Sequence, residues 1–303
     1  MRQKIKNMDR GILLMLLASL SFAIMGGFAK VLTDVLPPVE ITFFRNIAGV
    51  ILVGATIWKI PLKQRGGKPL MLLFRGTMGF LALLAYFYIM AYIPLGEAVT
   101  YNKTSPIFVA IFAYIFLKEE LPRAALLAIF VGFAGIVLVA KPDGFSLDKY
   151  DMLGIFSGIG AALAYTSIRE LRKYYDTRAI VLSFMGVGTI GPVVLMLLAP
   201  YVGGDSRDIL FAPFVMPVGV EWLMIIAVGI FATASQVLMT KAYELTKAGI
   251  VGTISYSNII FAVIIGVMLG DPIPDVWTFL GIILVIVAGL LVALPKEKKE
   301  ITK

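Results

Sequence analysis

Three positively charged side chains lie well inside apolar stretches of this 303-residue chain, namely Arg45, Arg75 and Lys103. If these stretches cross a membrane, each charge is costly unless it faces water or a partner. Guanidinium and ammonium groups bind carboxylates, phosphates and other anionic groups through charge-assisted hydrogen bonds. We therefore predict that these residues bind a ligand in a watery cavity. Pairing with backbone carbonyls or with Glu40 is the alternative.

Lys103 belongs to a belt of polar residues at positions 100–105, directly before Pro106, which we expect either to kink a helix or to leave a backbone carbonyl without its helical partner. A second belt contains Thr253, Ser255, Tyr256, Ser257 and Asn258. We expect the two belts to meet at the cavity. The candidate ligand contacts are therefore Tyr101, Asn102, Ser255, Tyr256 and Asn258, together with Tyr86 and Tyr165. The alternative is that the belts only hydrogen-bond between helices and that the tyrosines only pack.

Residue types that carry most enzyme chemistry are missing. The chain contains no cysteine and no histidine, which removes thiol nucleophiles, the commonest metal ligand and the commonest general base. It has no paired-carboxylate motif at helical spacing and no glycine-rich phosphate loop followed by Lys and Ser or Thr. We expect no catalytic residue, no metal site and no cofactor, so the protein is predicted not to be an enzyme.

The composition indicates which elements position these residues. Hydrophobic residues make up 59% of the chain, charged residues 15%, and the mean hydropathy is +0.92. A hydrocarbon core about 30 Å thick needs roughly 20 helical residues to cross it. Stretches of that length, apolar on all sides, predict an all-α, multi-pass membrane protein with spans at 11–31, 39–58, 69–92, 98–117, 122–140, 152–171, 179–199, 220–243, 248–269 and 275–294.

The distribution of Lys and Arg predicts the orientation of these spans. With a cytoplasmic N-terminus, nineteen of them fall in inner segments, three in outer loops and five inside spans. Both termini are therefore expected in the cytoplasm, in a cytoplasmic (inner) membrane. The net charge of +8 then reflects topology and contact with membrane lipids, so no nucleic-acid partner is expected. Lys30 and Arg169 lie near span ends, where we expect them to reach the headgroups.

The two halves of the chain resemble each other weakly. Ala91-Tyr92 through Pro122 to Gly135 reappears as Ala242-Tyr243 through Pro274 to Gly289. Five spans in each half would place the copies in opposite orientations, as inverted repeats require. We predict two five-helix units, residues 1–141 and 142–303. Shared apolar composition is the alternative source of the match.

Several short motifs resemble the EamA type of the drug/metabolite transporter superfamily. They are the segment 36–45 ending in Arg45, the pair Arg75-Gly76, the turn 91–98, and the run from Pro106 to Leu121. The second half departs from this pattern, because Met185 or a neighbour stands where an equivalent of Arg45 is expected. The resemblance implies ten helices, inverted symmetry, a central substrate cavity and alternating access. It does not imply one substrate.

Taken together, these features predict a carrier for a small metabolite, either amino-acid-like, nucleotide-like or an organic anion. The carrier would act as an exporter, exchanger or facilitator. The carboxylates lie at span ends, which favours facilitated diffusion or exchange over a proton relay, with a preference for substrates bearing an anionic group. A channel and a non-transporting membrane scaffold are the alternatives. The oligomeric state, monomer or homodimer, stays open.

Overall fold

The computed structural model describes residues 2–62, 65–117, 123–140, 147–205, 208–245 and 254–293. Within these ranges the regular structure is entirely helical. The helices are α1 (Arg2–Leu32), α2 (Pro38–Lys59), α3 (Pro69–Met90), α4 (Leu95–Asn102), α5 (Ser105–Leu117), α6 (Arg123–Ala140), α7 (Lys149–Leu171), α8 (Thr177–Val202), α9 (Val220–Leu245), α11 (Ser257–Met268) and α12 (Val276–Ala293). The prediction of an all-α protein is confirmed for this part of the chain.

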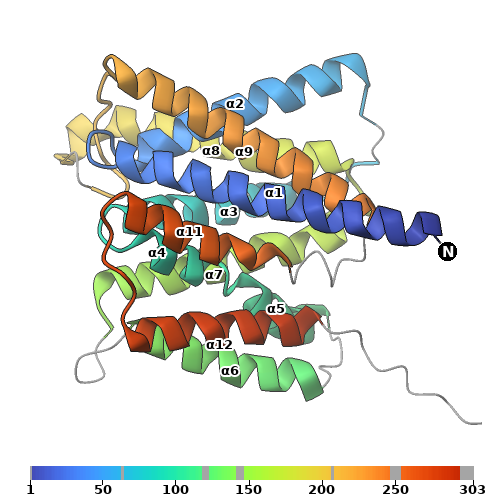
Figure 1. Cartoon of the computed structure of the whole chain (residues 1–303). Helices are drawn as coiled ribbons and strands as arrows, with labels where there is room; N and C mark the ends of the chain where they lie inside the picture. The colour runs from blue at the N-terminus through green and yellow to red at the C-terminus, as the bar shows by residue number, and fades with distance from the viewer. Residues whose placement is uncertain are drawn as a thin grey trace, which may run out of the picture.

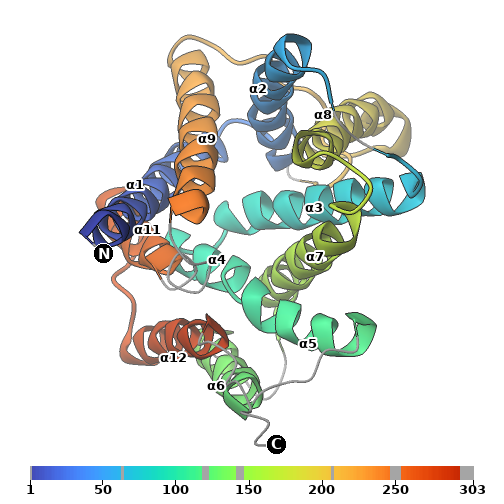
Figure 2. The ribbon, with the colours of Figure 1, turned by 90° about the vertical axis from the view of Figure 1, so that its right-hand side faces the viewer.

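Among the described residues, six helices are long and apolar enough to cross a membrane. They lie in α1, α2, α3, α7, α8 and α9, and three shorter apolar helices lie in α6, α11 and α12. Figure 1 shows most helices running side by side, with their axes roughly aligned. In Figure 2, turned by 90°, α3 lies lengthwise across the middle next to α7, while α2, α8 and α9 lie at one edge and α6 with α12 at the opposite edge.

Local signals set several helix ends. Proline at the first turn begins α2 and α3, where its missing N–H has no partner to lose. Asp148 caps α7 in a capping box with Asp151, and Gly203 ends α8 in the left-handed region with φ 74°.

The expected span 98–117 is broken rather than kinked. Helix α4 ends at Asn102, Lys103 and Thr104 form a turn, and α5 begins at Ser105. Pro106 stands in the first turn of the new helix, where proline fits without displacing a backbone hydrogen bond. The prediction of a kink at this proline is therefore corrected to a helix break.

Glycines allow helices from the two halves of the chain to pack closely. A Cβ atom added at Gly135 would lie 2.9 Å from the carbonyl oxygen of Gly281, and one added at Gly281 would lie 2.7 Å from that of Gly135. This reciprocal contact joins α6 to α12. At Gly76 an added Cβ would lie 2.7 Å from the Ser183 carbonyl, which joins α3 to α8. These small residues serve packing within one chain.

Candidate substrate cavity

A cavity of about 570 Å³ lies between α2, α8 and α9. It follows α2 from Arg45 to Ile60, a length of roughly 22 Å at the rise of an α-helix. Its volume falls within the range typical of small-molecule sites, about 300–1,000 Å³. The wall is largely apolar, and its polar side chains are those of Arg45, Thr56, Thr177, Arg178, Thr233, Gln236 and Lys241. This described lining holds three cations and no carboxylate.

Beyond Arg45 the bundle is tightly packed. A buried apolar cluster from α2, α3, α8 and the segment after it contains Val39, Phe80, Leu84, Met196 and Ala212. In the same region Glu40 is fully buried, and its Oε2 accepts a hydrogen bond of 2.9 Å from the Val215 N–H. The cavity thus reaches from the C-terminal end of α2 into the bundle and stops there.

Arg45 is held in place by its neighbour. Its Nη1 donates to Asn46 Oδ1 at 2.9 Å, and Asn46 Nδ2 donates to the carbonyls of Thr42 at 2.8 Å and Gly188 at 3.2 Å. A Cβ added at Gly188 would lie 2.5 Å from Asn46 Nδ2, so glycine permits this contact between α2 and α8. In the described part of the chain Arg45 forms no ion pair with Glu40, which is the pairing considered as its alternative role.

Arg75 meets Arg45 at an aromatic ring. The guanidinium carbon of Arg45 lies 5.4 Å from the Phe184 ring centroid, and that of Arg75 lies 5.0 Å from it. Both side chains are buried, with exposed fractions of 6% and 7%. Gly79 makes room for them, because an added Cβ would lie 2.5 Å from Arg75 Nη1 and 2.7 Å from the Phe184 ring. The structure therefore brings two predicted cations together around Phe184.

Two of the four predicted tyrosines, Tyr86 and Tyr165, lie near these arginines. Tyr165 of α7 is half-exposed, and its ring centroid lies 6.0 Å from the Arg75 guanidinium carbon. Tyr86 of α3 is buried and lies close enough to Arg45 for the two side chains to interact electrostatically. Arg75, Tyr86 and Tyr165 thus cluster around Arg45, which is the member of this group that lines the closed end of the cavity.

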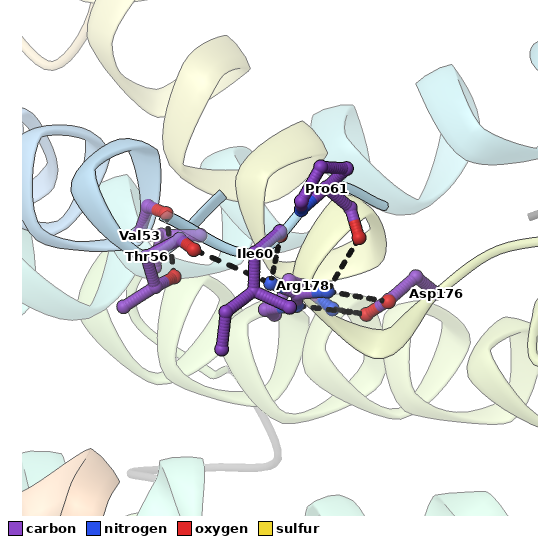
Figure 3. A network of polar contacts seen from close by, with 6 residues as sticks. All are labelled: Val53, Thr56, Ile60, Pro61, Asp176 and Arg178. Atoms are coloured by element: carbon purple, nitrogen blue, oxygen red, sulfur yellow. Dashed lines mark hydrogen bonds and ion pairs between the residues drawn. The ribbon is translucent and has the colours of Figure 1, made fainter. Parts of the chain in front are cut away.

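Arg178 organises the other end. Its guanidinium donates to the carbonyls of Ile60 at 2.7 Å and of Thr56 and Pro61 at 3.4 Å each, and it pairs with Asp176 at 2.9 Å (Figure 3). The Thr56 carbonyl already accepts a hydrogen bond from the Ile60 N–H, whereas the carbonyls of Ile60 and Pro61 follow the last residue of α2 and receive their donor from Arg178 of α8. Arg178 therefore joins the end of α2 to the start of α8 at the rim of the cavity.

The first polar belt bonds mainly to α7. Tyr101 is buried and donates to Asp151 Oδ1 at 2.6 Å, while Asn102 Nδ2 donates to Ser157 Oγ at 3.1 Å. Lys103 lies half-buried at the break between α4 and α5, and its ammonium makes no hydrogen bond or ion pair with a described residue. Tyr101 and Asn102 thus hydrogen-bond to α7, none of the three lines the cavity, and their role in ligand binding stays a prediction.

The second belt contacts α1 and α12. Asn258 Nδ2 donates to the Ser19 carbonyl at 2.9 Å, and the ring of Tyr256 fills the space over Gly289. Ser255 is half-buried, and Thr253 lies outside the described residues. Helices α4 and α11 do pack against each other, but these belt residues lie away from the cavity lining. Their role in ligand binding stays a prediction.

Several residues of the cavity wall and of the arginine cluster were not among the sequence candidates. Met185 lines the cavity and Phe184 contacts both arginines, but both are apolar residues in an apolar helix, so no local signal marks them. Thr233 and Gln236 interrupt the apolar helix α9, and polarity inside a span could have identified them. Arg178 and Lys241 are two of the nineteen Lys and Arg residues that the charge distribution places in inner segments, and no other signal marks them.

Known proteins were compared with this chain. The sequence matches the EamA-like transporter family over residues 9–141 and again over 148–294. It is 34% identical to an uncharacterised transporter of Helicobacter pylori strain 26695, over 97% of each chain. It is 34% identical to the pseudopaline exporter of Pseudomonas aeruginosa strain PA14, over 95% of this chain and 97% of that one.

A more distant relative is solute carrier family 35 member G1 of Homo sapiens, which is 28% identical over 94% of this chain and 79% of its own. One solved crystal structure aligns with 95% of this chain at a TM-score of 0.59 and 21% identity, which supports the fold alone. The apolar helices and these relatives identify an integral, multi-pass membrane protein related to transporters of small molecules. Since the family match extends over both halves of the sequence, the chain belongs to the EamA-like transporter family.

Proposed function

We propose that the protein is a carrier that moves a small metabolite across the cytoplasmic membrane by alternating access. One observation carries the proposal: the 570 Å³ cavity enters the bundle along α2 and stops at the packed layer beyond Arg45. A cavity that ends inside the bundle is what a carrier needs in one of its two states, because substrate enters without a continuous path. A channel in its open state would instead need a continuous path.

The opposite end of the bundle is closed by a clamp from three segments. Lys30 Nζ at the end of α1 lies 2.6 Å from Asp271 Oδ1 after α11, and it also donates to the Ile93 carbonyl at 2.9 Å. The Leu95 N–H, at the start of α4, donates to Asp271 Oδ2 at 2.7 Å. We name this set the Lys30–Asp271 clamp. Lys30 is thus bound within the protein, which corrects the expectation that it reaches the headgroups.

Inverted symmetry between the halves gives a mechanism for exchanging the open and closed ends. Suppose that α1, α2, α3 and α6 correspond to α7, α8, α9 and α12, and that α4 together with α5 corresponds to α11. The packing of α1 against α9 then corresponds to the packing of α7 against α3. The contact of α1 with α11 then corresponds to the contact of α7 with α5. Two further helix pairs, α2 with α8 and α6 with α12, each consist of corresponding helices, so exchanging the two halves leaves these pairs unchanged. The double match to one family, at 9–141 and 148–294, also supports two equivalent units.

The positive charge at the cavity mouth supports its orientation. The mouth lies at the C-terminal ends of α2 and α9 and the start of α8, where Arg178 and Lys241 line it. Because Lys and Arg concentrate on cytoplasmic loops, we place this mouth in the cytoplasm and the Lys30–Asp271 clamp on the outer side. The state described here is then open to the inside.

Counterflow in proteoliposomes tests the proposal. Vesicles with the purified protein are loaded with amino acids, nucleotides or organic anions in separate sets, and radiolabelled tracer of the same compound is added outside. A carrier gives transient, saturable accumulation for at least one compound, without dependence on an imposed pH gradient. Conductance without counterflow would identify a channel, and neither signal across the whole panel would leave the scaffold as the better account.

A further inference from the structure

Two buried guanidiniums at the closed end of the cavity have unused hydrogen-bond donors. The Nε atoms of both Arg45 and Arg75 are buried and have no hydrogen-bond partner. Arg45 gives one hydrogen bond, to Asn46, and Arg75 gives none to a described residue. A buried donor without an acceptor is costly, so each one calls for an explanation, and an ion or ligand that supplies the acceptor is one such explanation.

The charge of this pair is also uncompensated. No carboxylate of the described residues lies within ion-pair distance of either guanidinium. The shared contact with Phe184 gives each cation an attractive quadrupole, but it supplies no negative charge and no acceptor atom. Two like charges held around one ring in a medium of low polarity repel each other. An anion between them would satisfy both the donors and the charge.

The remaining cations of the cavity are less suited to this role. Arg178 already donates to three carbonyls and pairs with Asp176, and Lys241 is exposed at the mouth. Arg45 is therefore the cavity-lining cation that keeps free donors inside the bundle. A guanidinium presents its donors in a planar fork that matches carboxylate and phosphate oxygens.

The cavity wall next to Arg45 indicates what the anion is attached to. Along α2 and the facing helices the lining is formed by Gly49, Leu52, Val53, Val181, Met185 and Ala232. Such a wall excludes a strongly hydrated molecule and favours an apolar or aromatic body.

We propose that Arg45 and Arg75 bind the carboxylate or phosphate of an amphipathic organic anion whose apolar body lies along the cavity wall. This inference rests on the carrier function proposed above and specifies the class of its substrate. Arg45 contacts the anion at the end of the cavity, and Arg75, which shares the contact with Phe184, contributes the second cation. The substrate class is thus one anionic group on an apolar or aromatic body.

Binding of matched pairs of compounds to the purified full-length protein tests this inference. The pairs are indole-3-acetate with indole-3-acetamide and benzoate with benzamide, which differ mainly in charge, and phenyl phosphate with phenol, which lacks the anionic group altogether. We expect at least one anion to bind about tenfold tighter than its neutral partner, as loss of a charge-assisted fork implies. The ratio of the affinity for the anion to the affinity for its neutral partner should fall to about one in Arg45→Gln and in Arg75→Gln. It should stay unchanged in the control Arg172→Gln, which removes an exposed charge away from the cavity.

If a glutamine variant does not fold, Arg45→Lys and Arg75→Lys retain the charge and lose the fork, and a reduced ratio in them supports the site. Equal binding of every anion and its neutral partner, or a preference that survives all four substitutions, would overturn it. Counterflow separates this outcome from failure of the carrier function. Counterflow that is indifferent to both arginines removes the site and keeps the carrier, whereas arginine-dependent binding without any counterflow removes the carrier and keeps the site.

Discussion

The carboxylate of Asp271 joins Lys30, at the end of α1, to the backbone N–H of Leu95, at the start of α4. These contacts connect segments from both halves of the chain at the end of the bundle opposite the cavity mouth. Because the side chains are 20% and 11% exposed, the ion pair is only partly screened by solvent. The clamp is therefore expected to contribute to the stability of the state described here.

Breaking the clamp should destabilise this state. Asp271→Asn keeps an acceptor for the Leu95 N–H but removes the charge that faces Lys30, and we expect a loss of about 1–3 kcal/mol in the free energy of unfolding. The double variant Lys30→Met with Asp271→Asn should recover part of it, because no unpaired charge remains. Reversible unfolding in detergent gives the free energy of unfolding of the wild type, the two single variants and the double variant, which together form a double-mutant cycle. Strict additivity of the two single effects would contradict a direct interaction.

The contacts that Arg178 makes at the end of α2 should depend on the planar guanidinium group, which presents several donors at once. Arg178→Lys retains the charge but cannot contact the carbonyls of Ile60 and Pro61 together with Asp176, so we expect a loss of about 1–2 kcal/mol. Thermal unfolding of the purified protein measures it. Arg172→Lys, at an exposed position, is the matched control and should have no effect. Equal midpoints for both variants would show that the contacts in Figure 3 do not stabilise the fold.

The ion pair between Lys68 and Glu170 lies outside the membrane spans, and it predicts that the stability of the fold depends on pH. Hydrogen bonds from Lys173 and Lys68 hold the pKa of the Glu170 carboxyl below its ordinary value of 4.5. A carboxyl with a lowered pKa stabilises the fold above pH 4.5, and this contribution is lost as pH falls through the lowered value. The melting temperature of the wild type should therefore exceed that of Glu170→Gln at pH 7, and the difference should vanish in acid. A difference that grows toward low pH would contradict this.

Gly79 should be required because it lets Arg75 and Phe184 approach each other. In Gly79→Ala the new Cβ would meet both side chains, so we expect weaker anion binding and slower transport at unchanged expression. Gly54→Ala is the matched control, since no atom lies within 4 Å of its added Cβ. That control should be neutral or stabilise its helix by up to about 1 kcal/mol. Unchanged transport in Gly79→Ala would exclude a role for this cluster.

Lys103 provides a separate test of the first polar belt. Its ammonium has no partner among the described residues and lies at the break between α4 and α5. Under the carrier function Lys103→Met should abolish saturable transport while expression is retained, as measured by counterflow. Normal transport by this variant would show that Lys103 serves neither substrate nor conformational change.

Hydropathy predicted the helices because lipid leaves little choice: every backbone group must bond within its own segment. Arg45 and Arg75 were predictable for the same reason, since charge inside a span calls for a function. The partner of Lys30 was not predictable, because Asp271 lies in the other half of the chain and no local pattern links them. Phe184 was equally hidden, because its importance comes from the two cations that the fold places beside it.

The most direct test of alternating access uses the absence of native cysteine. Met185→Cys places one thiol in the cavity beside Gly49, and a membrane-impermeant maleimide is added to either side of oriented vesicles. We predict labelling from the side of the α2 C-terminus in the wild-type background, and additional labelling from the opposite side when Asp271→Asn opens the clamp. Labelling confined to one side in both backgrounds, or absent from both sides, would contradict the account.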